Sequence, residues 1–323
     1  MIPKAKILTN YPLKKLTTMK IGGPAKYFFI AKKENDLISA INWAKDSKIK
    51  WYIIGDGSNL VPSDSGFNGL VIKNEIKNFE KNGNRFFVGA GNNLLTFIYK
   101  LNQFGWAGME KMAGIPGTIG GAIYGSAGAY SQEIKDCLTK VKIYNGKETQ
   151  WLSKKQCRFG YRESIFKNPE GKPPASYGAG KKDWIILGAE FKFKKGDPKE
   201  LQKTSKEIIK MREKKYWPGL LCPGSFFKNI VINNVRPALR QKFLSKIDKS
   251  KVNHGKVPTG YLLEEVGAKG MKVGRIKVAK HHGNLIFNPG KGKSSEIIKL
   301  AKILKQKVKN KFGINLDEEI QYI

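Results

Sequence analysis

Histidine and cysteine are scarce in this sequence. Its few histidines all lie after residue 250, at His254, His281 and His282. Its cysteines number three, without the close spacing of metal ligands, at Cys137, Cys157 and Cys222. A histidine–cysteine metal site is therefore not indicated, and an odd number of widely spaced cysteines is typical of free thiols in a reducing cytoplasm.

Long apolar runs are also missing. None approaches the roughly 20 residues that a helix needs to span a bilayer. The first six residues, MIPKAK, have neither the apolar core nor the cleavage site of a signal peptide. We therefore expect a cytoplasmic protein without membrane contact. The length of 323 residues, 40% of them hydrophobic, suits a globular chain with two or three cores.

Acidic residues are few, since 26 Asp and Glu stand against 60 Lys and Arg, a formal net charge of +34. Such an excess is one mark of nucleic-acid-binding proteins. Here, however, the lysines are scattered over nearly every segment, and no basic block is interleaved with aromatic residues. We expect a monomer that binds no nucleic acid, and we keep a basic nucleic-acid-binding protein as a disfavoured alternative. The positive field would attract anionic small molecules.

Glycine, by contrast, is concentrated in residues 114–130, GIPGTIGGAIYGSAGAY, where six of seventeen residues are glycine. Backbone without side chains can approach a ligand closely and point its N–H groups at it. Ordering such backbone costs entropy, which a partner usually offsets. A flexible linker would be polar throughout, whereas Ile115, Ile119, Ile123 and Tyr124 interrupt the glycines. We interpret residues 114–130, the glycine-rich stretch, as an ordered loop against an anionic cofactor.

Hydrophobic periodicity and turn residues predict helices and strands along the chain. Helices are predicted over 34–47, 93–104, 198–215, 236–247, 259–266 and 295–312. Strands are predicted over 26–30, 51–54, 70–73, 86–89, 138–144, 184–193, 274–279, 284–287 and 319–323. Residues 168–182 are predicted to be a Gly/Pro/Lys loop, and a shift in composition indicates a domain boundary near residue 200.

A second glycine turn, GDGSN at 55–59, follows a predicted strand. It is not a Rossmann phosphate loop, because the third glycine of that motif would fall at Leu60 and no capped helix follows. Its N–H groups and hydroxyl suit a pyrophosphate, but an ordinary turn fits equally well, so both interpretations stay open. The GKS at 292–294 lacks the first glycine of a P-loop, because Phe287 stands there. We interpret Ser294 and Ser295 as a helix cap.

Three further stretches place chemically useful side chains beside turns. They are FGYRESIFK at 159–167, with an arginine among aromatics, PGSFFKN at 223–229, with a turn serine, and LDEEI at 316–320, with acids before the last strand. Each stretch also has an ordinary structural explanation. The arginine could lie in solvent at a strand edge, the serine could simply form the turn, and the acids could lie in solvent before the last strand. None of these stretches is specific by itself, and the sequence shows no recognisable Ser/His/Asp order.

Taken together and in order, these stretches resemble the UDP-N-acetylenolpyruvoylglucosamine reductase family. The similar segments run over nearly the whole chain, at 17–25, 55–69, 114–133, 161–166, 224–229, 256–260 and 316–319. One such motif is weak, whereas seven in register are specific. The resemblance implies an α+β fold. A vanillyl-alcohol-oxidase or PCMH-type FAD-binding region would cover 1–199, in subdomains of roughly 1–75 and 76–199. A C-terminal α+β substrate-binding domain would cover 200–323, and its last strand would return to the flavin region.

The resemblance also implies a chemistry and its residues. Non-covalent FAD and NADPH would reduce UDP-N-acetylglucosamine enolpyruvate to UDP-N-acetylmuramate in peptidoglycan precursor synthesis. The family's catalytic residues fall on Arg162, Ser225 and Glu319. Its cofactor-binding positions fall on Gly55, Gly57, Ser58, Asn59, Gly114, Ile115, Pro116, Gly117, Thr118, Gly120, Gly121, Gly128, Ala129 and Tyr130. Its substrate-binding positions fall on Tyr161, Lys228, Asn229, Lys256 and His282.

Those three catalytic residue types suit the implied reaction. Hydride addition to the enolpyruvyl carbon leaves negative charge on the neighbouring carbon and the carboxylate, which a fixed cation such as Arg162 stabilises. Glu319, if protonated, would donate to the same carboxylate, and Ser225 would protonate the carbon. A serine is a weak acid, so it needs close positioning and electrostatic assistance. NADPH would leave before the substrate binds, which implies ping-pong kinetics.

The sequence departs from the family pattern in a few places. Gly125-Ser126 stands where Met-Asn is usual, Tyr261 where Trp is usual, and Ile230 where proline usually follows Asn229. Residues 168–182 look like an insertion, and no substrate-capping Tyr-Gly loop precedes the helix at 198, which favours the family branch without that loop. Another flavin oxidoreductase of the same fold, acting on a sugar or lactone, is the alternative.

Overall fold

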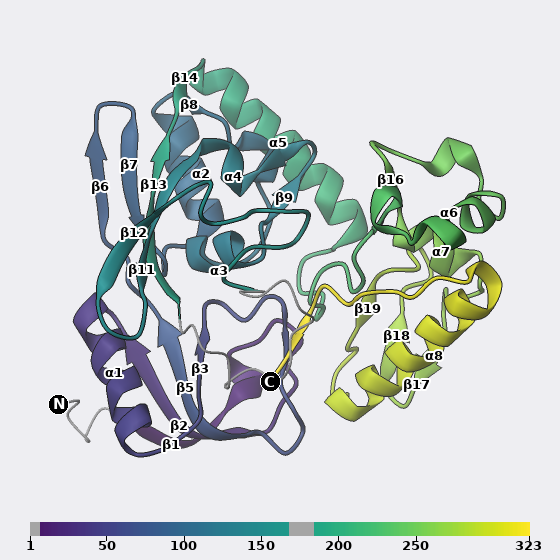
Figure 1. The fold of residues 1–323 in the computed structure, drawn as a ribbon, viewed down its shortest axis with the longest axis horizontal. Coiled ribbons are helices and arrows are strands. Elements are labelled where there is room, and N and C mark those ends of the chain that lie inside the picture. Colours follow the sequence, from purple (N-terminus) through teal and green to yellow (C-terminus); the bar gives the residue numbers. More distant parts are fainter. Residues whose placement is uncertain (1–6, 168–183) are drawn as a thin grey trace. The chain divides into compact units, whose positions relative to one another are not determined.

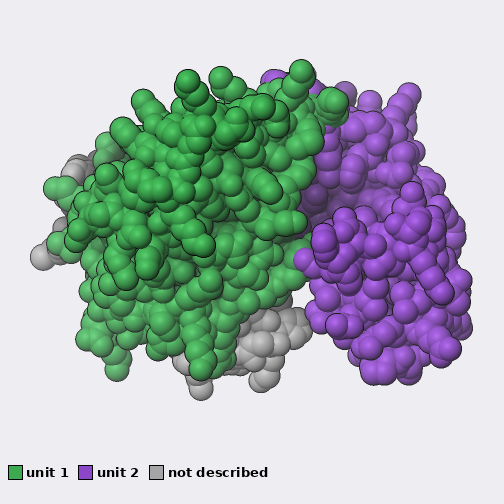
Figure 2. Space-filling model, turned by 90° about the horizontal axis from the view of Figure 1, so that it is seen from above, with its two compact units in different colours: residues 1–11, 25–57, 67–214 green, residues 12–24, 58–66, 215–323 purple. Residues whose placement is uncertain are grey.

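The computed structural model of the chain describes residues 7–167 and 184–323 (Figure 1). By compactness the chain divides into two units, drawn in green and purple in Figure 2. The first unit comprises residues 1–11, 25–57 and 67–214, and the second comprises residues 12–24, 58–66 and 215–323. The second unit is therefore built from three stretches of chain, two of which interrupt the first unit in sequence.

A small sheet and one helix begin the first unit. The strands lie in the order β1 (Leu8–Pro12), β2 (Pro24–Ala31), β5 (Phe67–Asn74) and β3 (Trp51–Ile54), with β2 and β3 both parallel to β5. Helix α1 (Glu34–Asp46) covers this sheet and buries Leu37, Ala40, Ile41 and Ala44 (Figure 1). These positions follow the spacing of one helix face, and the predicted helix is confirmed.

The second sheet of the first unit has five antiparallel strands. Their order is β12 (Thr149–Ser153), β11 (Leu138–Tyr144), β13 (Ile185–Lys192), β7 (Arg85–Gly89) and β6 (Phe79–Asn82). Its central strand, β13, is buried over most of its length, with Leu187, Ala189 and Phe191 fully enclosed. The strands predicted at 86–89, 138–144 and 184–193 are confirmed.

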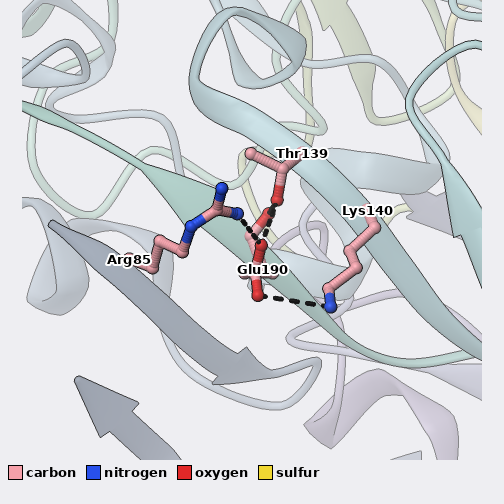
Figure 3. A network of polar contacts seen from close by, with 4 residues as sticks. All are labelled: Arg85, Thr139, Lys140 and Glu190. Atoms are coloured by element: carbon pink, nitrogen blue, oxygen red, sulfur yellow. Dashed lines mark hydrogen bonds and ion pairs between the residues drawn. The ribbon is translucent and has the colours of Figure 1, made fainter. Parts of the chain in front are cut away.

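A charge network ties three of these strands together at a partly exposed position (Figure 3). Glu190 of β13 accepts hydrogen bonds from Arg85 of β7 and Thr139 of β11, both at 2.7 Å, and Lys140 Nζ lies 3.4 Å from its other oxygen. Partial burial raises the pKa of Glu190, but the hydrogen bonds from Thr139 and Arg85 outweigh it and hold this pKa below its usual range. The network fixes strand register, and at this exposure it adds little to stability.

Helices and short strands complete the first unit. The helices are α2 (Leu94–Gln103), α3 (Ile119–Tyr124), α4 (Ile134–Cys137) and α5 (Pro198–Lys215). The two-stranded pairs are β8 (Trp106–Ala107) with β14 (Lys194–Lys195), and β9 (Gly128–Ala129) with β10 (Gln132–Glu133). Helix α2 ends as predicted, because Gly105 after it takes the left-handed conformation, with φ 69°.

The second unit is built on helix α8 (Ser294–Phe312) and short strands. The helix buries Ile297, Leu300, Ala301, Leu304, Val308 and Phe312, and left-handed Gly313 follows its end, as predicted. Helices α6 (Pro237–Leu244) and α7 (Thr259–Glu264) are shorter. The strands pair as β4 (Leu60–Val61) with β20 (Gln321–Tyr322), β15 (Ile230–Val231) with β16 (Lys256–Val257), and β17 (Lys272–Val273) with β18 (Ile276–Val278) and β19 (Ile286–Phe287).

The start of α8 is capped from a distant part of the chain. Asp64 accepts hydrogen bonds from the N–H groups of Ser294 (2.7 Å) and Ser295 (3.0 Å), and from the Ser295 hydroxyl (2.8 Å). In return, the Ser294 hydroxyl accepts from the Asp64 N–H at 2.9 Å. The predicted serine cap is therefore wrong, because Lys293 occupies the N-cap position and the Asp64 carboxylate, rather than a serine hydroxyl, accepts from the first N–H groups of the helix.

The domain boundary near residue 200 stays a prediction, because compactness is a different criterion from a functional domain. By compactness α5 belongs to the first unit up to Lys214, and residues 12–24 and 58–66 belong with the C-terminal residues. The predicted insertion at 168–182 lies outside the described residues. No helix within the described ranges combines the length and apolar character needed to cross a membrane.

Candidate active site

The glycine-rich stretch, interpreted from the sequence as an ordered loop, contains a short helix, α3. Thr118 caps it by accepting from the Gly121 N–H at 3.2 Å. The N–H groups of Ile119 and Gly120 donate to the carbonyls of Asn92 (2.9 Å) and Ala90 (2.8 Å). These three N–H groups therefore form hydrogen bonds within the protein itself. The sequence pattern did not show this, because two of the three partners, Asn92 and Ala90, come from another segment.

The two predicted cofactor loops come together inside the first unit. A Cβ added to Gly55 would lie 2.4 Å from Thr118 Oγ1, so only glycine allows this approach. Asn93 links the loops further, because its side-chain N–H₂ donates to Asp56 Oδ2 at 3.2 Å and to the Gly117 carbonyl at 3.4 Å. Two turns that are far apart in sequence thus form one surface.

Part of the strained backbone lies in or against the glycine-rich stretch. Ten described residues other than glycine have left-handed φ values, and four of them are here: Ser126 (46°), Tyr130 (49°), Ser131 (64°) and Arg162 (57°). Such residues cost energy and cluster at functional sites, where surrounding contacts hold them. Here Arg162 Nη2 donates to the Gly128 carbonyl at 2.7 Å, and Nη1 donates to the Ser126 carbonyl at 3.3 Å.

The arginine motif at 161–166 is anchored to the glycine-rich stretch by two side chains. Besides Arg162, Ser164 is buried and donates to the Tyr124 carbonyl at 2.7 Å. The Arg162 guanidinium also lies 5.3 Å from the centre of the Tyr161 ring, and Lys167 Nζ donates to the Arg162 carbonyl. A solvated arginine at a strand edge is therefore excluded.

In the second unit, the Ser225 segment pairs with the Glu319 segment. The Glu319 N–H donates to the Phe226 carbonyl at 2.8 Å, and Phe227 and Glu318 form an antiparallel bridge. The Lys228 N–H adds a bond to the Asp317 carbonyl at 2.9 Å. The predicted proton donor and the predicted acid thus lie on neighbouring strands of chain.

A buried asparagine that the sequence did not single out holds the Ser225 segment. Asn284 is 3% exposed, and its side chain both accepts from the Phe227 N–H and donates to the Phe227 carbonyl, at 2.8 Å each. Its carbonyl accepts from the Phe226 N–H at 3.1 Å. Asn284 therefore makes the hydrogen bonds to Phe226 and Phe227 that a neighbouring strand would otherwise make. No sequence pattern marks it, since a lone Asn after a glycine is typical of a turn.

The glycine turn at 55–59 ends in the second unit, where it meets two other motifs. Asn59 Nδ2 donates to the Glu319 carbonyl at 3.0 Å, and the Asn59 carbonyl accepts from the Gln321 N–H at 2.9 Å. The Ser58 carbonyl accepts from the Thr18 hydroxyl at 3.3 Å. Motifs from near the start and from the end of the chain therefore meet at Ser58 and Asn59.

The predicted substrate residues of the second unit lie on adjacent elements. Asn229 accepts from the Thr259 N–H at 3.2 Å, and the Thr259 hydroxyl donates to the Lys228 carbonyl. Lys256 of β16 pairs with Val231 of β15, and β15 begins directly after Asn229. The fifth predicted substrate residue, Tyr161, belongs to the first unit.

His282 is held as a neutral imidazole. Burial first, and then the charge of Lys215, lower its pKa to about 4. Its Nδ1 accepts from the Asn284 N–H at 3.0 Å, which assigns the ring proton to Nε2. The ring fills the space above Gly260, where an added Cβ would lie 2.7 Å from it. Neutral His282 presents an N–H donor, a suitable group for a phosphate or carbonyl oxygen.

The predicted catalytic residues are thus divided between the units, with Arg162 in the first and Ser225 and Glu319 in the second. In the described part of the chain, no group of three or more His, Cys, Asp or Glu side chains is placed to hold a metal ion. None of the three cysteines, all within the described residues, is part of a disulfide.

The residues of the glycine-rich stretch fit a large planar or anionic cofactor. Gly121 is exposed, and an added Cβ there would meet only Thr118 Oγ1, at 3.5 Å. Ser126 is 1% exposed, and its Oγ meets no hydrogen-bond partner within residues 7–167 and 184–323. A buried hydroxyl without a partner is costly unless a bound group satisfies it.

Comparison with known proteins first defines the class. A model described as an FAD binding domain matches residues 25–151, and one described as the C-terminal domain of UDP-N-acetylenolpyruvoylglucosamine reductase matches residues 219–323. The chain therefore joins an α+β FAD-binding domain to a C-terminal domain of that reductase, which confirms the predicted fold class.

Full-length relatives then define the family. The chain is 38% identical to the UDP-N-acetylenolpyruvoylglucosamine reductase of Solibacter usitatus, over 100% of this chain and 98% of the relative. It is 31% identical to reductase 1 of Bacillus anthracis, over 98% and 95%. The solved structure of UDP-N-acetylenolpyruvylglucosamine reductase (MurB) from Thermus caldophilus superposes with a TM-score of 0.72 at 25% identity, over 98% and 97% of the two chains. The chain belongs to the UDP-N-acetylenolpyruvoylglucosamine reductase family, as its motifs predicted.

Proposed function

We propose that this protein reduces UDP-N-acetylglucosamine enolpyruvate to UDP-N-acetylmuramate in peptidoglycan precursor synthesis, with FAD bound and NADPH as the hydride donor. The observation that carries the proposal is the pairing of the Ser225 and Glu319 segments through the 2.8 Å bond from the Glu319 N–H to the Phe226 carbonyl. It brings together the backbones of the two segments that carry the proposed hydroxyl and carboxyl, which are the two groups that the reaction needs besides a cation. The relatives' name supports the same reaction.

Cofactor binding falls to the first unit and the turn that leaves it. Gly55, Gly57, Ser58 and Asn59, together with the glycine-rich stretch, would hold FAD without a covalent bond. Ser126 Oγ, buried without a partner in the described ranges, is available to the cofactor. Bound FAD would supply the redox chemistry, taking hydride from NADPH and giving it to the enolpyruvyl carbon.

Arg162 stabilises the negative charge that develops on the substrate carboxylate and the carbon beside it. Its guanidinium is fixed by two carbonyl oxygens of the glycine-rich stretch. A cation that is already oriented does not have to reorganise during the reaction, which is why preorganised charges contribute strongly to catalysis. Glu319, in its protonated form, donates to the same carboxylate.

Ser225 gives its hydroxyl proton to the carbon next to the carboxylate. The left-handed Gly224 before it (φ 89°) and the Asn284-bound Phe227 after it set the direction of its side chain. Tyr161, Lys228, Asn229, Lys256 and His282 bind the substrate. Because NADPH leaves before the substrate binds, the kinetics are ping-pong. We place the reaction in the cytoplasm, where free thiols persist.

A stepwise spectral titration tests the proposal. Purified protein should be yellow, and its blue absorbance band should bleach with NADPH and recover when the enolpyruvyl substrate is added. Ser225→Ala should keep the first step and slow the second by about 10²- to 10⁴-fold, the usual contribution of a general acid. Ser245→Ala, which removes an exposed hydroxyl bonded to the Lys242 carbonyl, is the control. Colourless protein that FAD cannot reconstitute, or a Ser225→Ala variant with both steps intact, would contradict the proposal.

A further inference from the structure

Tyr216 lies beside the proposed proton donor, in a segment that no sequence motif marked. Its phenolic oxygen is 3.0 Å from Ser225 Oγ, a normal hydrogen-bond distance between hydroxyls. Both residues belong to the second unit, and both are partly buried. The distance does not say which oxygen donates. A phenol is a much stronger acid than an aliphatic alcohol and therefore the better donor.

The segment around Tyr216 is fixed on both sides. The Lys215 carbonyl lies 3.0 Å from His281 Nε2, and Trp217 packs on the rings of His281 and Phe287, with centroids 5.6 and 5.9 Å away. The Tyr216 ring itself packs against the core of the second unit. Its hydroxyl is thus held by contacts that do not depend on Ser225, as a positioning group requires.

A charge also lies near the phenol. Lys215 Nζ is 4.9 Å from the centre of the Tyr216 ring, a cation–π distance. Negative charge that passes to the phenolic oxygen is therefore offset by a cation beside the same ring. A lone serine lacks such assistance and is a poor proton donor.

From this geometry we infer that Tyr216 is a positioning residue for the proposed reaction, donating its hydroxyl hydrogen to Ser225 Oγ. The inference rests on the proposed function, in which Ser225 protonates the substrate carbon. With Tyr216 as donor, the Ser225 hydrogen points away from Tyr216 and is available to the substrate. As the Oγ–H bond breaks and a C–H bond forms, Oγ takes the Tyr216 proton. Water then returns a proton to the phenolic oxygen.

Tyr216→Phe removes this one hydroxyl. We expect unchanged FAD content and an unchanged rate of flavin reduction by NADPH. The kcat for reduction of the enolpyruvyl substrate should fall about 10- to 100-fold, the effect of one hydrogen bond to a charged oxygen. The KM should change far less, and the solvent deuterium isotope effect on kcat should rise, because proton transfer becomes slower. A packing defect would not raise this isotope effect.

Two further variants make the test specific. Tyr144→Phe loses a similar hydroxyl, bonded to the Gly146 carbonyl at 2.9 Å in the first unit, and should leave all these rates unchanged. In a Ser225→Ala background, Tyr216→Phe should have no further effect, because a residue that acts through Ser225 has nothing left to act on. An equal loss in both backgrounds, or a kcat within twofold of the unmodified protein, would overturn the inference.

The outcomes separate this inference from the proposed function. Unmodified protein that never reduces the enolpyruvyl substrate refutes the function and the inference with it, whereas active protein indifferent to Tyr216→Phe refutes the inference alone. If Tyr216→Phe fails to fold, 3-fluorotyrosine at 216 keeps the shape and makes the phenol more acidic. The isotope effect on kcat should then change, and an unchanged value overturns the inference.

Discussion

Two adjacent glycines of α3 are expected to respond differently to an added side chain. A Cβ at Gly120 would lie 2.9 Å from Ala90 Cβ and 3.1 Å from the Ala90 carbonyl oxygen, closer than ordinary contacts. A Cβ at Gly121 would meet only Thr118 Oγ1, at 3.5 Å, and Gly121 is exposed. Gly120 therefore faces the protein's own backbone, whereas Gly121 faces outward, where we propose that FAD lies.

The magnitudes follow from these distances. Gly120→Val overpacks the contact with Ala90 and should lower the free energy of unfolding by about 1–3 kcal/mol. Gly121→Val should leave stability nearly unchanged, because replacing a helical glycine regains up to about 1 kcal/mol and no close contact opposes it. If FAD packs on α3, the added side chain of Gly121→Val should overpack the contact with FAD. The free energy of FAD binding then becomes less favourable by the same 1–3 kcal/mol, which weakens binding about 5- to 150-fold.

The assay needs no turnover. The dissociation constant of FAD is measured by titrating the apoprotein and following flavin fluorescence, and stability is measured by urea unfolding of each apoprotein. Gly120→Val serves as the matched control for Gly121→Val, one residue away on the same helix. A folded Gly121→Val variant that binds FAD as tightly as the unmodified protein would refute the placement of the cofactor against α3.

Two predictions concern pH and capping. Asp64→Ala should destabilise the protein by about 1 kcal/mol in urea unfolding, the usual cost of a lost helix cap. Partial burial raises the pKa of Asp64, but the hydrogen bonds from Ser295 and Ser294 prevail and lower this pKa from 3.8. The stability that the cap contributes is therefore present above pH 3.8 and is lost as the pH falls further. Equal stability of the Asp64→Ala variant and the unmodified protein at pH 7 would contradict this prediction. His282, with a folded pKa of about 4 against 6.5 unfolded, contributes stability that is present above pH 6.5 and lost as the pH falls toward 4. His282→Gln should flatten the unfolding free energy over this window, and an unchanged pH profile would refute the assignment.

Local pattern predicted the long elements well. In α1, α2 and α8 the apolar residues repeat with the period of one helix face, and that face is buried in each. The glycines after α2 and α8 take left-handed conformations that other residues adopt at a cost. These features depend on neighbours in sequence, so the sequence is sufficient to predict them.

Other features depend on partners that sequence proximity cannot reveal. The glycine-rich stretch was expected to point its N–H groups at a cofactor, but the N–H groups of Ile119 and Gly120 serve the carbonyls of Asn92 and Ala90. Glycine at 120 thus reflects close packing, whereas its neighbour at 121 is exposed. Composition cannot distinguish these two uses of glycine, because both require only the absence of a side chain.

By itself, the sequence determined the family, the α+β class and the residue types available for chemistry, because motif order and hydrophobic period are written along the chain. The tertiary structure decided which of these residues meet. It anchored Arg162 to the carbonyls of the glycine-rich stretch, set the Ser225 segment beside Glu319, and brought Tyr216 within 3.0 Å of Ser225 Oγ. Hydrogen bonds and packing act over a few ångströms, so contacts between distant segments exist only once the chain has folded.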